Sequence, residues 1–179
     1  MRAMAIALTV LACSSAHAQR NAVSVDLSPE AAAQAFKAAV VDVCVPAVSG
    51  GGVSALPAAR NGKVQPTQDV ETRRQAGASV DETVWDVVEA RGVVTLREKS
   101  GRCVVSVYGP PTSATIADAT MTLLVHGFEA LAEPATGFTQ ALMGRSGGRR
   151  VMVQLSGVEP GSPGHQSKFS VVTATVFAQ

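Results

Sequence analysis

Alternating apolar and polar positions predict a β-hairpin over residues 94–108, whose sequence is VTLREKSGRCVVSVY. The dipeptide Ser100-Gly101 suits a two-residue turn, and pairing the strands across it sets Glu98 opposite Cys103. Neighbouring side chains of a strand point to opposite faces of the sheet. Cys103 therefore shares the core-facing side with alternate apolar residues of the hairpin, namely Val94, Leu96, Val105 and Val107.

Apolar residues at helical spacing predict a first helix that begins after Ser28 and ends near Cys44. Ser28 is a suitable N-cap, and Pro29 suits the first helical position. We expect Pro46 to prevent much extension, because proline lacks the backbone N–H that an interior helical position needs. Cys44 continues the apolar side of this helix, so its thiol is expected to face the core.

The remaining pattern predicts further elements around the hairpin. Ser79 and Glu82 resemble a capping box that opens a helix through Trp85, although a strand is an alternative there. A second helix is expected from about Ser113, with Met121 on its apolar side, and it ends at Gly127. Two strands flank the Gly-rich turn GRSGG. The final segment SKFSVVTATVFAQ is apolar on both faces, which predicts a central strand.

These elements predict one α+β domain over residues 19–179. We expect a mostly antiparallel β-sheet with two or three helices packed on one face, because short links between strands favour antiparallel pairing. Residues 46–78 are rich in Gly, Pro and small side chains and are expected to form a long, poorly patterned loop.

The first 18 residues are typical of a secretory signal peptide. Arg2 precedes an apolar run, and Ala16-His17-Ala18 forms an A-x-A cleavage site. The expected location is therefore periplasmic or secreted, with the mature chain beginning at Gln19. One alternative stays open: VLAC loosely resembles a lipoprotein box, which would anchor the protein to a membrane through Cys13.

Cleavage changes the charge balance and the cysteine count. It leaves 161 of the 179 residues and removes Arg2 from the 15 basic residues, so that 14 basic side chains balance 14 acidic ones. This neutrality argues against a nucleic-acid partner, and we expect no transmembrane segment in the mature chain. Two cysteines remain in an oxidising compartment, and both are expected to face the core. We therefore predict a Cys44–Cys103 disulfide.

Catalytic and metal-binding signals are weak. Gly144 to Gly148 match the G-x-S-x-G pattern of serine hydrolases, but that elbow requires a helix after the turn, and a strand is expected there. Ser146 is therefore expected to be a turn residue. The two mature histidines, His126 and His165, lack metal-ligand spacing. We predict no catalytic residue, no metal site and no cofactor.

One charged segment stands out. Arg145, Arg149 and Arg150 lie within six residues, in a chain with no acidic residue between Glu133 and Glu159. Strand alternation puts Arg149 and Arg150 on opposite faces, at a tip suited to carboxylate or phosphate binding.

Two function classes remain. The first is a non-enzymatic envelope protein that binds another macromolecule, as a partner or an inhibitor. The bound macromolecule would be an envelope protein or an anionic polymer. The alternative is a small periplasmic enzyme that acts on cell-wall material, with a site assembled from scattered residues.

Overall fold

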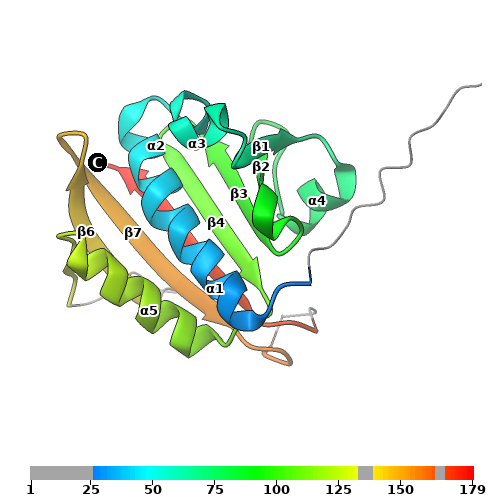
Figure 1. Cartoon of the computed structure of the whole chain (residues 1–179). Coiled ribbons are helices and arrows are strands. Elements are labelled where there is room, and N and C mark those ends of the chain that lie inside the picture. The colour runs from blue at the N-terminus through cyan, green and yellow to red at the C-terminus, as the bar shows by residue number, and fades with distance from the viewer. Residues whose placement is uncertain (1–25, 133–138, 164–167) are drawn as a thin grey trace, which may run out of the picture.

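The first helix of the computed structural model is longer than the sequence pattern indicates (Figure 1). The structure describes residues 26–132, 139–163 and 168–179. The expected signal peptide and Cys13 lie outside these ranges, as does His165. Ser28 caps the helix as predicted, because its side chain accepts a hydrogen bond from the Ala31 N–H at 3.2 Å.

The prediction that Pro46 stops this helix is wrong. The helix continues through α1 (Pro29–Ala38), the π-helical segment η1 (Ala39–Cys44) and α2 (Val45–Gly50). In the π-helical segment the Val45 N–H bonds to the Val40 carbonyl, five residues back. This wider turn stands directly before Pro46, whose missing N–H and ring would disturb an ordinary α-turn. The helix ends where Gly51 adopts a left-handed conformation.

By length and composition alone, the helix from Pro29 to Gly50 could cross a membrane, since its mean hydropathy is 1.5. Half of it is buried inside the protein, however, mainly against the sheet. Burial of this kind is typical of the core helix of a globular domain, which passes the same test of length and composition.

In the described residues, eight strands form one antiparallel sheet in the order β1-β2-β3-β4-β8-β7-β6-β5. Every neighbouring pair is antiparallel, which confirms the predicted α+β class. The strands are β1 (Val64–Thr67), β2 (Thr83–Val87), β3 (Val94–Lys99), β4 (Arg102–Tyr108), β5 (Glu129–Ala130), β6 (Gln140–Ser146), β7 (Arg149–Val158) and β8 (Val171–Ala178).

The predicted register of the β3–β4 hairpin is confirmed, with Glu98 opposite Cys103 and Lys99 opposite Arg102. The prediction for the last strand is also confirmed, because β8 lies in the middle of the sheet between β4 and β7. Its inward residues Val172, Ala174 and Val176 are fully buried.

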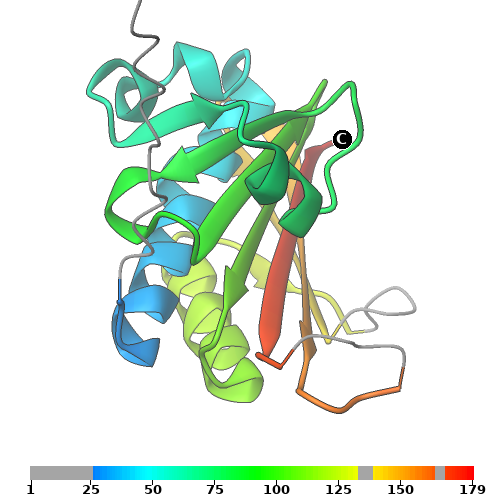
Figure 2. The same ribbon diagram turned by 90° about the vertical axis from the view of Figure 1, so that its right-hand side faces the viewer.

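Apart from the short helical segments of the first half, the two halves of the chain share an order of one long helix followed by four strands. A long helix precedes strands β1–β4, and helix α5 (Thr112–Val125) precedes strands β5–β8. The last strands of the two halves, β4 and β8, pair at the centre of the sheet. Both helices lie on the same side of the sheet (Figure 2), and Lys37 and Asp118 form an ion pair between them at 2.7 Å.

Helix α5 confirms the predicted element but not its details. It begins at Thr112, immediately after Pro111, so Ser113 is not its cap. Met121 is 59% exposed and does not face the core. The side of α5 that is buried against the sheet contains polar as well as apolar residues, so it differs from the apolar side that the sequence predicted. Its buried residues are Thr112, Thr115, Ile116, Ala119 and Leu123.

The expected loop over residues 46–78 contains regular structure. Besides α2 and β1 it includes η2 (Val53–Ala55), α3 (Pro57–Arg60) and α4 (Val70–Gln75). The elements α3, β1 and α4 are short, and few of their residues are buried. Their sequences therefore show no clear spacing of apolar residues from which a helix or strand could be predicted.

The segment after α4 folds as a strand, which is the alternative to the predicted helix. Glu82 does accept a hydrogen bond from the Ser79 N–H at 2.8 Å, as in a capping box. The chain then enters β2, followed by η3 (Val88–Ala90). Residues around α4 cover β3 and β4 on the face opposite the helices. There Tyr108 Oη donates to the Gln75 carbonyl at 2.8 Å, and Arg97 donates to the Gly77 carbonyl at 2.9 Å.

Candidate functional site

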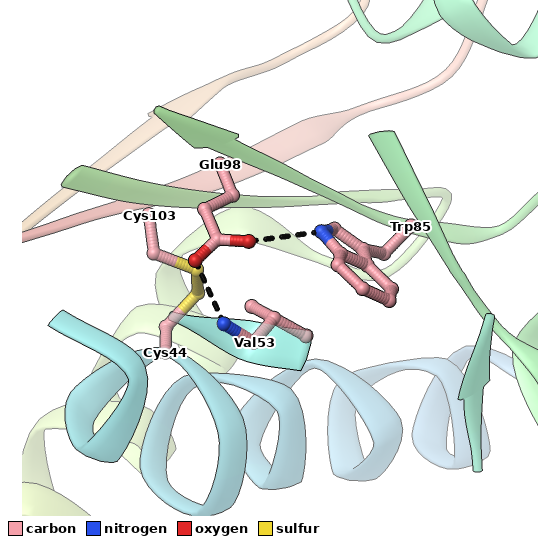
Figure 3. The surroundings of a disulfide bond; sticks show 5 residues. All are labelled: Cys44, Val53, Trp85, Glu98 and Cys103. Atoms are coloured by element: carbon pink, nitrogen blue, oxygen red, sulfur yellow. Dashed lines mark hydrogen bonds between the residues drawn. A yellow bond between two sulfur atoms is a disulfide. The ribbon is translucent and has the colours of Figure 1, made fainter. Parts of the chain in front are cut away.

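The disulfide Cys44–Cys103 joins the first helix to β4, as predicted (Figure 3). The two Cα atoms are 5.4 Å apart, and both residues are completely buried. The π-helical segment ends at Cys44, which directs this thiol toward the sheet, while strand alternation directs Cys103 toward the helix. A buried disulfide between two core elements has a structural role.

The Glu98 carboxylate lies beside the disulfide and is held by two donors (Figure 3). Its Oε1 accepts a hydrogen bond from the Val53 N–H at 2.7 Å, and its Oε2 accepts one from Trp85 Nε1 at 3.2 Å. Trp85 is 6% exposed, so its ring packs in the core. Gly52 has a φ angle of 98°, and a Cβ there would lie 2.6 Å from Glu98 Oε1, so any other residue would be strained and would displace this carboxylate.

The β6–β7 hairpin carries the G-x-S-x-G pattern at its tip. Gly147 and Gly148 have φ angles of 54° and 81°, which glycine adopts readily in a tight hairpin turn. Ser146 pairs with Arg149 across this turn and accepts a hydrogen bond from Ser49 Oγ at 2.9 Å. Strand β7 follows the turn, as predicted, so Ser146 does not stand in the strand–turn–helix geometry of a hydrolase elbow.

The three arginines of this hairpin divide between the two faces of the sheet. Arg145 pairs with Arg150 on the face opposite the helices, which we call the outer face. Arg149 is on the other face, together with the buried Val151 and Val153. The hairpin register thus confirms the predicted separation of Arg149 from Arg150.

Two further cations, Lys99 and Arg102, stand at the turn of the β3–β4 hairpin. Arg102 pairs with Phe177 of β8, and Phe177 pairs with Met152, which stands two residues from Arg150. The two hairpin turns and the C-terminal end of β8 therefore lie at one end of the sheet, near α2 (Figure 1). We call this set the basic end, which consists of Lys99, Arg102, Arg145, Arg149 and Arg150.

Most of the positive charge at the basic end is not neutralised. Lys99 forms an ion pair with Asp81. Hydrogen bonds from Lys99, and secondarily from Ser79, lower the pKa of the Asp81 carboxyl to about 2. Among the residues that the structure describes, none of the four arginines has a carboxylate within 4.0 Å.

Beside these arginines, the outer face of β6–β8 is partly exposed to solvent. Apolar side chains stand in the row nearest the arginines, and polar ones continue along the strands. The partly exposed residues of this surface are Met143, Met152, Gln154, Thr173, Thr175 and Phe177. The sheet therefore presents a mixed surface with a cationic border.

The structure brings together no metal-ligand group in its described part. No three His, Cys, Asp or Glu side chains there lie close enough to hold a metal ion. His126 is exposed just beyond the C-terminal end of α5.

Sequence reasoning identified Arg145, Arg149 and Arg150 but missed Arg102. Only the placement of β8 between β4 and β7 brings Arg102 to them. No protein-family model matches the chain, and no curated protein or solved structure matches it significantly.

Proposed function

We propose that the chain is an exported, non-enzymatic protein that binds an acidic envelope protein through the basic end of its sheet. The N-terminal signal pattern and a buried disulfide support export, because such bonds form and persist in oxidising compartments. In the expected mature chain basic and acidic residues are equal in number, so a cluster of unneutralised cations is a local feature of the surface rather than a result of composition.

The observation that carries this proposal is the convergence of four arginines from β4, β6 and β7 without carboxylate partners. Guanidinium groups suit bidentate binding of carboxylates. The adjoining Met152 and Phe177 favour a protein over an anionic polymer, because methionine and aromatic residues are enriched where proteins meet. An anionic polymer would contact the arginines but would leave the apolar side chains next to them exposed to solvent.

The test is to capture partners from envelope extract with the mature protein and with the variant Arg145→Ser/Arg150→Ser. A matched control, Arg60→Ser/Lys63→Ser, removes the same charge near β1, at the opposite edge of the sheet. We expect a partner that the wild type and the control recover but the basic-end variant does not. Its recovery should also fall at high salt, since salt screens exposed charges.

Equal recovery by all three proteins at both salt concentrations would contradict the proposal. Recovery of polysaccharide or lipopolysaccharide in place of a protein would also contradict it.

A further inference from the structure

A pocket of about 500 Å³ opens at the basic end, next to the disulfide. Its walls come from the C-terminal end of α2, from the β3–β4 turn and from the start of β7. The residues that matter for its chemistry are Gly51, Gly52, Glu98, Lys99, Arg102 and Arg149, all of which line it. The pocket thus collects charged side chains from both halves of the chain.

The charges inside the pocket do not cancel. Asp81 and Lys99, which both line it, pair with each other. Glu98 directs its two oxygens to the Val53 N–H and to Trp85 Nε1. Among the described residues, neither Arg102 nor Arg149 has a carboxylate within 4.0 Å, although the charge of Arg102 acts on Glu82 and helps to lower the pKa of that carboxyl. The pocket is thus lined by two arginines that form no close ion pair and by one carboxylate already engaged by neutral donors.

The end of the first helix contributes an opposing charge that is too small to change this conclusion. The carbonyl end of a helix carries the equivalent of roughly half a negative charge, which disfavours an anion nearby. Arg102 and Arg149 each carry a full positive charge at every physiological pH. Even with the Glu98 carboxylate included, the pocket stays positive and favours an anion.

The walls of the pocket are fixed before any ligand arrives. The disulfide ties the first helix to β4, and the bond from Val53 to Glu98 ties the segment after this helix to β3. On the other side, the hydrogen bond from Ser49 to Ser146 joins the helix end to the β6–β7 hairpin. A preformed site loses little conformational entropy when it binds, which favours affinity.

We propose that this pocket holds an acidic segment of the protein partner, with Arg102 and Arg149 binding its carboxylates. The inference rests on the proposed function and adds a defined subsite, which Arg149 lines from the inner face and Arg102 lines from the rim next to the outer face. The volume favours a peptide segment, because a bare phosphate ion would fill only a small part of about 500 Å³. Glu98 sets a limit on the anion, since its own carboxylate repels one placed deep in the pocket.

The test is a titration of the isotope-labelled, oxidised mature protein with hexaglutamate, followed by NMR of backbone amides. Hexaglutamine and inorganic phosphate are the comparison ligands. We expect hexaglutamate to shift the amides of Gly51, Gly52, Ser100 and Gly101 in a saturable way, and hexaglutamine to leave them unchanged. The variant Arg102→Gln/Arg149→Gln should weaken this binding by about tenfold or more, the size expected when a charge-assisted hydrogen bond is lost.

The matched control is Arg145→Gln/Arg150→Gln, which removes the same charge from the outer face. It should weaken hexaglutamate binding at the pocket by no more than about twofold, because exposed charges at a distance are largely screened. Unchanged amide shifts away from the substituted residues show that each variant is folded.

Three results would overturn the inference. The pocket amides could fail to shift, the Arg102→Gln/Arg149→Gln variant could bind as the wild type does, or phosphate could saturate the pocket at the same concentrations as hexaglutamate. The last result would identify a simple anion site. None of them depends on the envelope capture with Arg145→Ser/Arg150→Ser, so failure of the pocket and failure of the proposed function are distinguishable.

Discussion

Glu98 and Cys103 stand directly opposite each other in the β3–β4 hairpin, so a carboxylate and the disulfide occupy neighbouring positions on the inner face of the sheet. The disulfide fixes the helix to this hairpin at Cys44. The carboxylate fixes the segment after the helix at Val53. One cross-strand pair therefore positions two consecutive parts of the chain.

Replacing Glu98 with Gln should lower the free energy of unfolding by about 1–3 kcal/mol, because an amide has only one acceptor for the two donors that now meet the carboxylate. Urea unfolding of the oxidised protein measures this. The control Glu89→Gln changes an exposed carboxyl in η3 and should have an effect within about 0.5 kcal/mol. Equal effects of the two substitutions would show that Glu98 does not tether Val53 and Trp85.

Removing the disulfide with Cys44→Ala/Cys103→Ala should cost about 4 kcal/mol, because the bond closes a loop with a sequence separation of 59 residues in the unfolded chain. Urea midpoints of the variant and the oxidised wild type provide the comparison. Chemical reduction of the wild type should give a similar loss. A loss below about 1 kcal/mol in both experiments would contradict a structural role for the disulfide.

Changing Ser146 to Ala should lower the free energy of unfolding by about 1 kcal/mol through loss of the hydrogen bond from Ser49. One hydrogen bond joins the two residues. The double variant Ser49→Ala/Ser146→Ala should therefore lose less free energy of unfolding than the summed losses of the two single variants. A fluorophosphonate probe should label none of these proteins. Specific labelling of Ser146 in the wild type would instead identify a nucleophile.

Asp86 should make stability depend on pH. Burial raises the pKa of its carboxyl, and the charge of Arg91 and a hydrogen bond from Thr67 offset this only in part. The folded state therefore takes up the proton at a higher pH than the unfolded state, so stability is lost as pH rises from the ordinary aspartate pKa through the raised one.

It follows that Asp86→Asn should raise the urea midpoint at pH 7 relative to the wild type, and that this difference should disappear near pH 3. A variant less stable than the wild type at pH 7 would show that the interactions with Arg91 and Thr67 outweigh the burial of charge.

The exported protein should begin at Gln19. Intact-mass measurement and N-terminal sequencing of material recovered from the envelope check this directly. A mature chain that starts at Cys13 and carries a diacylglycerol adduct would replace this expectation with a lipoprotein anchor.

Short-range patterns predicted much of this fold. The turn at Ser100-Gly101 sets the hairpin register, and that register with the line of the first helix places Cys103 and Cys44 on facing surfaces. Alternation along a strand also separated Arg149 from Arg150 correctly. In each case, the determining interaction lies within a few residues or within one element.

The features that sequence reasoning missed depend on packing between distant segments. A proline predicts the end of a helix, but the π-helical turn before Pro46 lets the helix continue beneath the sheet. Packing against β6–β8 determines which side of α5 is buried. Thr115 is buried there, whereas Met121 is exposed to solvent. The pocket could not be predicted either, because Arg102 and Arg149 come to the same end of the sheet only through the placement of β8 between β4 and β7.

The repeated order of a long helix and four strands has a consequence for how the chain would mature under the proposed export. Both cysteines belong to the first half, and all the strands that surround Cys103 on one side precede Tyr108. In the export proposed above, the thiols could therefore meet and oxidise before the second half has crossed the membrane. Strand β8 would then complete the sheet by adding to the open edge of β4, so the disulfide could form before the second half of the chain folds.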